Sequence, residues 1–421
     1  MNKYKIDVLS NKLRLITIPL PKAPTMTALV IVKTGSKYEN RRNNGISHFL
    51  EHLFFKGTAK RPDTLALSSE LDSLGGEYNA FTAKEFTGYW VKVAASKAAQ
   101  ALDIVSDMLL NSRFDAVEIE KEKGVIIEEL NMYEDNPMMH IEDVFETCLY
   151  GDTPAGWDTI GTKENIRRFK REDFIKYLKS QYGARSVYVV LVGGIDVATK
   201  KAATKLFSVF KKNKWQDKLP VKEKQSAPRS LSVYKKIDQV NLSLGVRAYP
   251  FGHPDEFKVK LLAIILGGSM SSRLFTNLRG RNGLAYYVRT MTELYSDSGY
   301  LTTQAGVPIT RAEEAIKIIL AEYRRIMDEP VGTKELKRAK DLLQGKMSLQ
   351  MEATDNLANW YARQVISRSK ILTPAEFLAR IKEISAADLQ KTAKKIFVNR
   401  GLNLALIGAV KGEKFKKILK F

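Results

Sequence analysis

Two similar segments, which begin 215 residues apart, limit most strongly what this 421-residue chain can fold into. The first, DFIKYLKSQYGARSVYVVLVGGID, starts at Asp173, and the second, DLQKTAKKIFVNRGLNLALIGAVK, starts at Asp388. Each reads as an amphipathic helix, a turn that contains glycine, and an apolar strand that stops at Gly193 or Gly408. The repeat predicts two domains of one α+β design.

A polar, basic and proline-containing stretch, KKNKWQDKLPVKEKQSAPRS, separates the two halves and is typical of a linker. We therefore predict a first domain over residues 1–215, a linker over residues 216–231 and a homologous second domain over residues 232–421. In each half, strands and long amphipathic helices predict a mainly antiparallel sheet covered on one face by helices. In the first half we expect helices near residues 45–55, 62–74, 97–111, 116–133 and 171–181.

The charge of the chain is large and unevenly distributed. Lys and Arg exceed Asp and Glu by 21, yet residues 101–150 contain three basic and thirteen acidic side chains. A strong positive charge can indicate nucleic-acid binding, but no segment interleaves basic and aromatic residues. A solvated, lysine-rich surface is the preferred interpretation, so we expect no nucleic-acid partner.

The single cysteine, Cys148, rules out an internal disulfide and a thiolate metal cluster, and it fits a reducing compartment. The sequence contains no apolar run of about 18 residues, which a membrane-spanning helix would need. The N-terminal segment alternates apolar and polar residues and lacks the apolar core of a signal peptide. These features predict a cytoplasmic protein without a membrane partner.

The stretch GISHFLEHLFFKGT contains two of the four histidines of the chain. In a helix, His48 and His52 would lie one turn apart on one face, and Glu51 would share that side. Asn43 or Asn44 is the expected N-cap. A lone histidine on an apolar helix is more often a core residue than a ligand, but three polar groups would cost several kcal/mol if they were buried without partners. The spacing favours a zinc site.

A catalytic zinc site needs a third protein ligand, which must come from elsewhere in the chain. The acidic stretch EIEKEKGVIIEELNMYEDNP contains candidates. As a helix it places Glu122, Ile126 and Glu129 on one stripe, with Glu128 about 100° away. One glutamate of the stripe could bind the metal while the other supports a ligand. A solvated acidic helix face is the alternative that periodicity alone leaves open.

The pentapeptide HFLEH, residues 48–52, is followed after 76 intervening residues by Glu129. This pattern resembles the pitrilysin family of inverted-motif zinc peptidases, which includes insulysin and the mitochondrial processing peptidase. The stretches LDSLGGEYNAFTAKEFTGYW, EKEKGVIIEELNMYEDNP and SSRLFTNLRGRNGLAYYV extend the likeness from about Leu13 to Gly408. The length resembles that of the short, single-unit bacterial members.

The resemblance implies a zinc-dependent endopeptidase that hydrolyses peptides or unfolded segments. It implies zinc ligation by His48, His52 and Glu129, with Glu51 as the general base and Glu122 as a second catalytic-site carboxylate. A catalytically silent homologue that acts as a structural or peptide-binding subunit is the alternative, and the intact ligand set argues against it.

The resemblance also implies how substrate is held. Asn79 and Ala80 match an edge strand that pairs with an extended peptide, and Arg279 and Tyr286 match a substrate-contacting pair. The second half has no HxxEH sequence, since His253 lies in YPFGHPDEF, so the second domain is expected to hold substrate without metal. The double-length members of the family imply that two copies of this chain form a homodimer.

Overall fold

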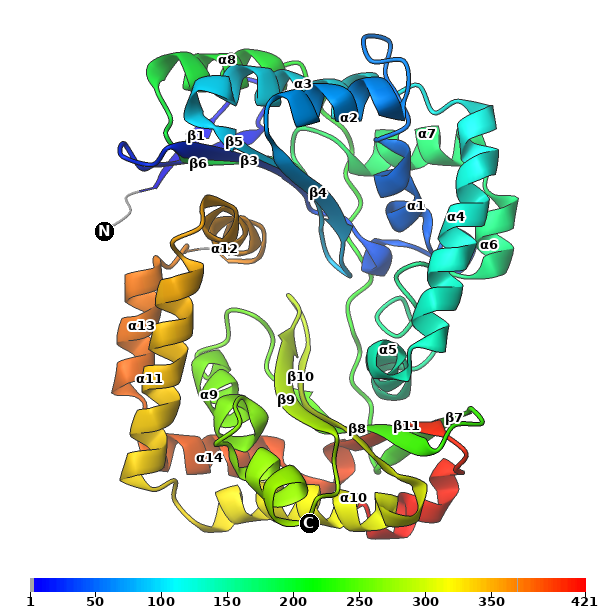
Figure 1. Cartoon of the computed structure of the whole chain (residues 1–421), viewed down its shortest axis with the longest axis vertical. Coiled ribbons are helices and arrows are strands. Elements are labelled where there is room, and N and C mark those ends of the chain that lie inside the picture. Colours follow the sequence, from blue (N-terminus) through cyan, green and yellow to red (C-terminus); the bar gives the residue numbers. More distant parts are fainter. Residues whose placement is uncertain (1–3, 369) are drawn as a thin grey trace. The chain divides into compact units, whose positions relative to one another are not determined.

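The computed structural model describes residues 4–368 and 370–421, which form two compact units (Figure 1). The first unit comprises Met1–Leu130, Asp158–Leu219 and Ser348–Thr373, and the second comprises Asn131–Trp157, Pro220–Met347 and Pro374–Phe421. Each unit therefore includes a segment from the other half of the chain. The division predicted from the sequence, into residues 1–215 and 232–421, does not coincide with these units for that reason.

The first unit is built on a six-stranded sheet with the strand order β1-β2-β6-β3-β5-β4. All neighbouring strands are antiparallel except β2 and β6. The central strand β3, with the sequence TMTALVIV, is almost wholly buried. The strands are β1 (Lys5–Val8), β2 (Arg14–Pro19), β3 (Thr25–Val32), β4 (Glu77–Thr82), β5 (Thr87–Ala94) and β6 (Val187–Gly193).

Helices lie on both faces of this sheet (Figure 1). Helix α3 packs against one face, and α12 packs against the other, where Leu357 and Tyr361 meet Leu29 and Ile31 of β3. The helices are α1 (Ile46–Leu53), α2 (Thr64–Ser73), α3 (Ala98–Asn111), α4 (Ala116–Asp135), α6 (Lys163–Arg168), α7 (Arg171–Gln181), α8 (Val197–Phe207) and α12 (Thr354–Ser367), with the short 3₁₀ segments η1 (Ser36–Tyr38) and η2 (Ala95–Lys97).

The second unit is built on a five-stranded sheet with the order β7-β11-β8-β10-β9, in which only β7 and β11 are parallel. Helix α5 covers one face, where Phe145 and Leu149 pack with Tyr300 and Ile407. Helices α9, α10 and α14 pack against the other face (Figure 1). The strands are β7 (Arg229–Tyr234), β8 (Gln239–Ala248), β9 (Tyr287–Leu294), β10 (Gly299–Pro308) and β11 (Leu402–Gly408).

The helices of the second unit come from three stretches of the chain. They are α5 (Pro137–Tyr150), α9 (Glu256–Gly267), α10 (Ala312–Asp328), α11 (Thr333–Gln350), α13 (Pro374–Glu383) and α14 (Ala386–Ile396), with the short segments η3 (Phe275–Arg281), η4 (Ile309–Arg311), η5 (Asn399–Gly401) and η6 (Gly412–Ile418). The predicted linker overlaps the start of β7, because that strand begins at Arg229. None of the helices in the described part of the chain combines the length and the apolar composition that a membrane crossing needs.

The predicted repeat is confirmed by the strand order. Strand β6 pairs with β2 in parallel and with β3 in antiparallel fashion, and β11 pairs in the same way with β7 and β8. Both strands end at a glycine with positive φ, 118° at Gly193 and 154° at Gly408. The α+β class and the mainly antiparallel sheets are confirmed as well. The structure adds one helix on the second face of each sheet, supplied by the other half of the chain.

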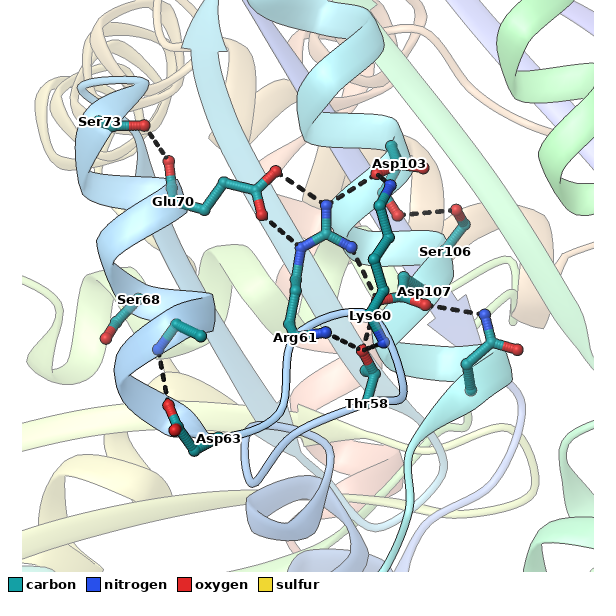
Figure 2. A network of polar contacts seen from close by, with 12 residues as sticks. Thr58, Lys60, Arg61, Asp63, Ser68, Glu70, Ser73, Asp103, Ser106 and Asp107 are labelled. Atoms are coloured by element: carbon teal, nitrogen blue, oxygen red, sulfur yellow. Dashed lines mark hydrogen bonds and ion pairs between the residues drawn. The ribbon is translucent and has the colours of Figure 1, made fainter.

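A buried arginine connects the segment that follows α1 to α2 and α3 (Figure 2). The guanidinium group of Arg61 donates to both carboxylate oxygens of Glu70, at 2.6 and 2.8 Å. It also donates to Asp103 and Asp107, at 2.7 Å each. The Thr58 hydroxyl group donates to the same oxygen of Asp107 at 2.6 Å. Arg61 is 2% and Asp107 is 6% exposed, so these two form a buried ion pair, and the partly exposed carboxylates of Glu70 and Asp103 further compensate the desolvation of the guanidinium group.

We expect Arg61→Met to lower the free energy of unfolding by about 3–5 kcal/mol, because it leaves the buried carboxylate of Asp107 without its cation. The matched control is Lys121→Met, which removes an exposed pair with Glu118 on α4 and should cost less than about 1 kcal/mol. Urea denaturation of both variants measures the difference. Equal, small losses would show that the Arg61 cluster contributes no more than a surface ion pair.

Candidate metal centre

Helix α1 carries both histidines of the HxxEH sequence. The helix begins after Gly45, whose φ of 98° lies in the left-handed region, and a Cβ atom there would lie 2.3 Å from the backbone oxygen of Ile160. The N-cap is therefore Gly45, and the prediction of Asn43 or Asn44 is wrong. The rings of His48 and His52 lie next to each other in an edge-to-face arrangement with their centroids 4.7 Å apart, as the i,i+4 spacing predicts.

Helix α4 brings two glutamates to these histidines. Glu122 places Oε1 2.8 Å from Nδ1 of His52 and Oε2 2.6 Å from Nζ of Lys56. Glu129 places its two oxygens 3.6 Å from Nε2 of His48 and 3.3 Å from Nε2 of His52. The seven-residue spacing on a continuous helix puts both carboxylates on the same side, whereas Glu128 is exposed.

The donor atoms of His48, His52 and Glu129 lie within 4.8 Å of one another, a spacing compatible with one metal ion. The Glu122 carboxylate accepts a hydrogen bond from Nδ1 of His52, so Nδ1 carries a proton, and Nε2, which lies 3.3 Å from Glu129, is the ring atom that would bind a metal ion after losing its own proton. Two imidazole nitrogens and one carboxylate oxygen form the ligand set that zinc prefers in catalytic sites. The residues present therefore fit a zinc ion.

The environment moves the pKa values of these groups in different directions. The hydrogen bonds with His48 and His52 hold the pKa of Glu129 well below its usual range. Burial alone would lower the pKa of His52, but the hydrogen bonds to Glu122 and Glu129 outweigh burial and raise it to about 9. Burial raises the pKa of Glu51 above its usual value, against the attraction of His48. Glu51 thus differs from the two α4 carboxylates in its readiness to take up a proton.

Glu51 faces the edge strand β4. The Thr82 hydroxyl group donates a hydrogen bond of 2.6 Å to Oε2 of Glu51. Thr82 is the last residue of β4, and within the described sheet β4 pairs with β5 alone, so its other edge is free. Asn79 and Ala80 lie in this strand, and the Ala80 N–H donates to the Asn79 side chain at 2.8 Å. The structure therefore brings Glu51, the histidines and the predicted peptide-binding strand together in one unit.

Arg279 and Tyr286 lie together in the second unit. Arg279 belongs to η3, and its guanidinium carbon is 5.9 Å from the ring centroid of Tyr286. Tyr286 is 73% exposed and directly precedes β9, the edge strand of the second sheet. His253 of the same unit stacks on Tyr249 with a centroid distance of 4.0 Å, which accounts for it as a packing residue.

Three contributors to the site were not predicted. Lys56 lies in the turn that follows α1, which ends at Leu53, so helical spacing from His52 did not indicate it. Thr82 follows Ala80 by two residues and therefore points to the same face of β4. The third is Glu39, whose carboxylate accepts hydrogen bonds at the start of α1 and which carried no motif signal.

Comparisons with known proteins show the family of this chain and agree with its fold. Residues 14–163 match the family described as Insulinase (Peptidase family M16), and residues 168–343 match the Peptidase M16 inactive domain. The chain is 34% identical to an uncharacterized zinc protease of Rickettsia felis, over 94% of this chain and 95% of the relative. It is 31% identical to the uncharacterized zinc protease YmxG of Bacillus subtilis, over 91% and 93% of the two chains.

Solved structures show the same fold. A protease from Helicobacter pylori superposes with a TM-score of 0.91 at 22% identity, covering 97% of this chain and 99% of the other. A peptidase M16 inactive domain from Pseudomonas fluorescens superposes with a TM-score of 0.88 at 17% identity, with the same coverage. The sequence relatives define a zinc-protease class of proteins. The chain belongs to peptidase family M16, the insulinase and pitrilysin family, as its sequence motifs predict.

We expect Glu129→Gln to abolish stoichiometric zinc uptake, because a neutral amide replaces the only carboxylate that faces both Nε2 atoms among the described residues. Glu128→Gln is the matched control on the same helix and should retain one zinc ion per chain. Zinc content after dialysis, measured by atomic absorption, distinguishes the two. A reversed result would mean that the carboxylates of α4 are assigned one residue out of place.

Proposed function

We propose that this chain is a zinc-dependent endopeptidase that hydrolyses peptides or unfolded segments. The observation that carries this proposal is the convergence of His48, His52 and Glu129 beside a separate carboxylate, Glu51, at a free strand edge. The names of the relatives as zinc proteases support it. His48, His52 and Glu129 would hold the metal, and Glu122 would orient His52.

The proposed chemistry divides the work between the metal and one glutamate. When bound, zinc supplies polarisation of a carbonyl group and acidifies a water molecule. Glu51 accepts the proton of the attacking water on a carboxylate oxygen and later returns it to the leaving amine. The Thr82 hydroxyl group holds Oε2 of Glu51, which fixes the direction of the other oxygen. The raised pKa of Glu51, caused by burial, suits a group that takes up and releases a proton.

We propose that the substrate lies extended along β4. An added strand is held by backbone hydrogen bonds, which are indifferent to sequence, so many peptides can be accepted. The Ala80 N–H now donates to Asn79 Oδ1, at the edge away from β5. A substrate carbonyl group would replace Asn79 Oδ1 as the acceptor, and the freed Asn79 amide could then bind the substrate itself. Asn79 and Ala80 are thus the proposed peptide-binding residues of the first unit.

The roles of Arg279 and Tyr286 and the homodimer rest on the family resemblance. Their mutual contact and the exposure of Tyr286 support a role in contacting substrate. We propose that two chains form a homodimer in which Tyr286 donates to the developing oxyanion and Arg279 holds backbone carbonyl groups of the peptide. We also propose a cytoplasmic location, which the single cysteine supports.

The alternative is a catalytically silent subunit that only binds peptides. The second half matches a domain described as inactive, but the first half contains His48, His52 and Glu129 together with Glu51. Measured zinc content together with hydrolysis of a quenched fluorescent peptide separates the two functions. A chain that binds peptide and zinc but never cleaves would be the silent subunit.

Replacement of Glu51 by Gln tests the proposed base. We expect Glu51→Gln to keep zinc and to lower kcat by about 10²-fold or more, because the proton acceptor is lost while the ligands remain. Thr82→Val, which removes only the hydrogen bond to Glu51, should give a smaller loss. Hydrolysis of a quenched peptide and the zinc content are measured on the same samples. Parental activity in Glu51→Gln would exclude the mechanism.

A mixing experiment tests the proposed homodimer. Glu51→Gln and Tyr286→Phe should each be inactive, and subunit exchange between them should restore about a quarter of all sites if each site takes its base and its tyrosine from different chains of a symmetric dimer. Tyr234→Phe, at an equally exposed tyrosine of the second unit, should leave the parent active. No recovery despite verified exchange would mean that Tyr286 does not act on the partner's site.

A further inference from the structure

The first turn of α1 has an unusual N-terminus. The helix begins at Ile46, so His48 is its third residue and lies in the first turn. Backbone N–H groups in this turn have no partner within the helix. The usual solution is a side-chain acceptor at the N-cap, but Gly45 has no side chain. The close approach of Gly45 to the Ile160 carbonyl oxygen excludes one. The acceptor must therefore come from another part of the chain.

Glu39, which lies six residues before the N-cap, provides this acceptor. Its Oε2 accepts from the Gly45 N–H at 2.8 Å and from the Asn44 side-chain amide at 3.1 Å, and its Oε1 accepts from the Ser47 N–H at 2.8 Å. Glu39 is 4% exposed. Burial raises its pKa, against the hydrogen bonds from Ser47, Gly45 and Asn44. The positive end of the helix dipole also favours a carboxylate at this position.

The residue next to His48 is fixed from a second direction. The Ser47 hydroxyl group lies 2.7 Å from the Tyr177 hydroxyl group, which lies 2.9 Å from the Thr34 hydroxyl group. All three residues are buried. Ser47 is thus held at its N–H by Glu39 and at its side chain by α7, so the backbone of the first turn has little freedom to move.

The two histidines differ in what orients them. His52 is oriented directly, because its Nδ1 is bonded to Glu122 at 2.8 Å. His48 is 8% exposed, and its Nδ1 is buried without a hydrogen-bond partner among the residues that the structure describes. No side chain in this region therefore does for His48 what Glu122 does for His52. The direction of the His48 ring depends on packing and on the backbone of the first turn.

We infer that Glu39 is a positioning residue of the metal centre, which orients His48 by fixing the first turn of α1. This inference rests on the proposed function, because it assigns Glu39 to a site whose metal is itself proposed. A helix cap of this kind could serve stability alone, so the distinguishing property is metal binding. Ligands must be held within about 0.5 Å of the productive geometry, and a loosened first turn would no longer do this for His48.

The test compares Glu39→Gln with a cap on a helix that carries no site residue. Asp196 caps α8 in the same unit by accepting from the Thr199 N–H at 2.6 Å, so Asp196→Ala removes a similar interaction. Thermal unfolding, zinc affinity by chelator competition and the visible spectrum of the Co²⁺-substituted protein are measured for both. We expect both to lose stability, but only Glu39→Gln should bind zinc about tenfold more weakly and show altered Co²⁺ bands.

Parental zinc affinity and an unchanged Co²⁺ spectrum in Glu39→Gln would reduce Glu39 to a structural cap and overturn the inference. If the parent binds no zinc, the proposed function fails first. If Glu39→Gln does not fold, Glu39→Asp replaces it, because the shorter carboxylate cannot reach both N–H groups, and the same loss of affinity is expected.

A measurement on the unaltered chain does not depend on whether a variant folds. Zinc should slow hydrogen exchange at Gly45 and Ser47 and not at Thr199, because coupling is reciprocal, and equal exchange at all three would also overturn the inference.

Discussion

A helix of two turns carries both histidines, and a helix this short is not stable on its own in water. The site therefore depends on interactions that hold α1 at its two ends. At the start, Glu39 accepts from the first turn. At the end, the following segment is fixed where Thr58 bonds to Asp107 and where Arg61 completes the cluster on α3 (Figure 2).

The segment that follows α1 also fixes the position at which α4 begins. Thr58 forms a β-bridge with Ser112, and the Arg113 N–H donates to the Gly57 carbonyl group at 3.2 Å. These residues join α3 to α4, so one short stretch of backbone fixes both the end of α1 and the start of the helix that carries Glu122 and Glu129. This explains how candidate ligands separated by 76 residues can keep a common geometry. It also makes the Arg61 cluster relevant to the site, although none of its side chains is a candidate ligand.

Much of this could be predicted from the sequence, because the strongest signals were local. Helix α7 has the predicted limits, Arg171–Gln181, since its apolar period and the capping residue Asp173 both lie within it. The HxxEH spacing and the seven-residue spacing on α4 are also local, and each places its side chains on one side of a helix. The helices α5 and α12 were different. An amphipathic pattern shows that a helix has an apolar face but not which sheet will cover it.

Two features were not predicted: the second helical layer on the first sheet, which had a signal in the sequence, and the cap that Glu39 provides for α1, which had none. The unbroken apolar run of β3 is typical of a strand covered on both faces, and it would have predicted a second helical layer on the first sheet. Glu39 had no such signal. Capping rules consider the residue at the helix start. The Glu39 carboxylate comes from six residues before that position, and whether it reaches the helix depends on the fold of the η1 segment.

The three carboxylates of the site show how one small region can assign different roles to the same chemical group. Glu129 and Glu122 both have lowered pKa values: His48 and His52 stabilise the charge of Glu129, and for Glu122 the hydrogen bonds from His52 and Lys56 outweigh the effect of burial. Among the described residues, the Thr82 hydroxyl group donates a hydrogen bond to Glu51, and burial raises the pKa of Glu51. Environments that separate pKa values in this way suit the proposed division between the charged carboxylates of α4 and a proton carrier. The division follows from position along α1 and α4, because Glu51 points to β4 while the α4 glutamates point to the imidazoles. The proposed peptidase chemistry needs both kinds of carboxylate within reach of one carbonyl group, and here two helices and one strand edge bring them together.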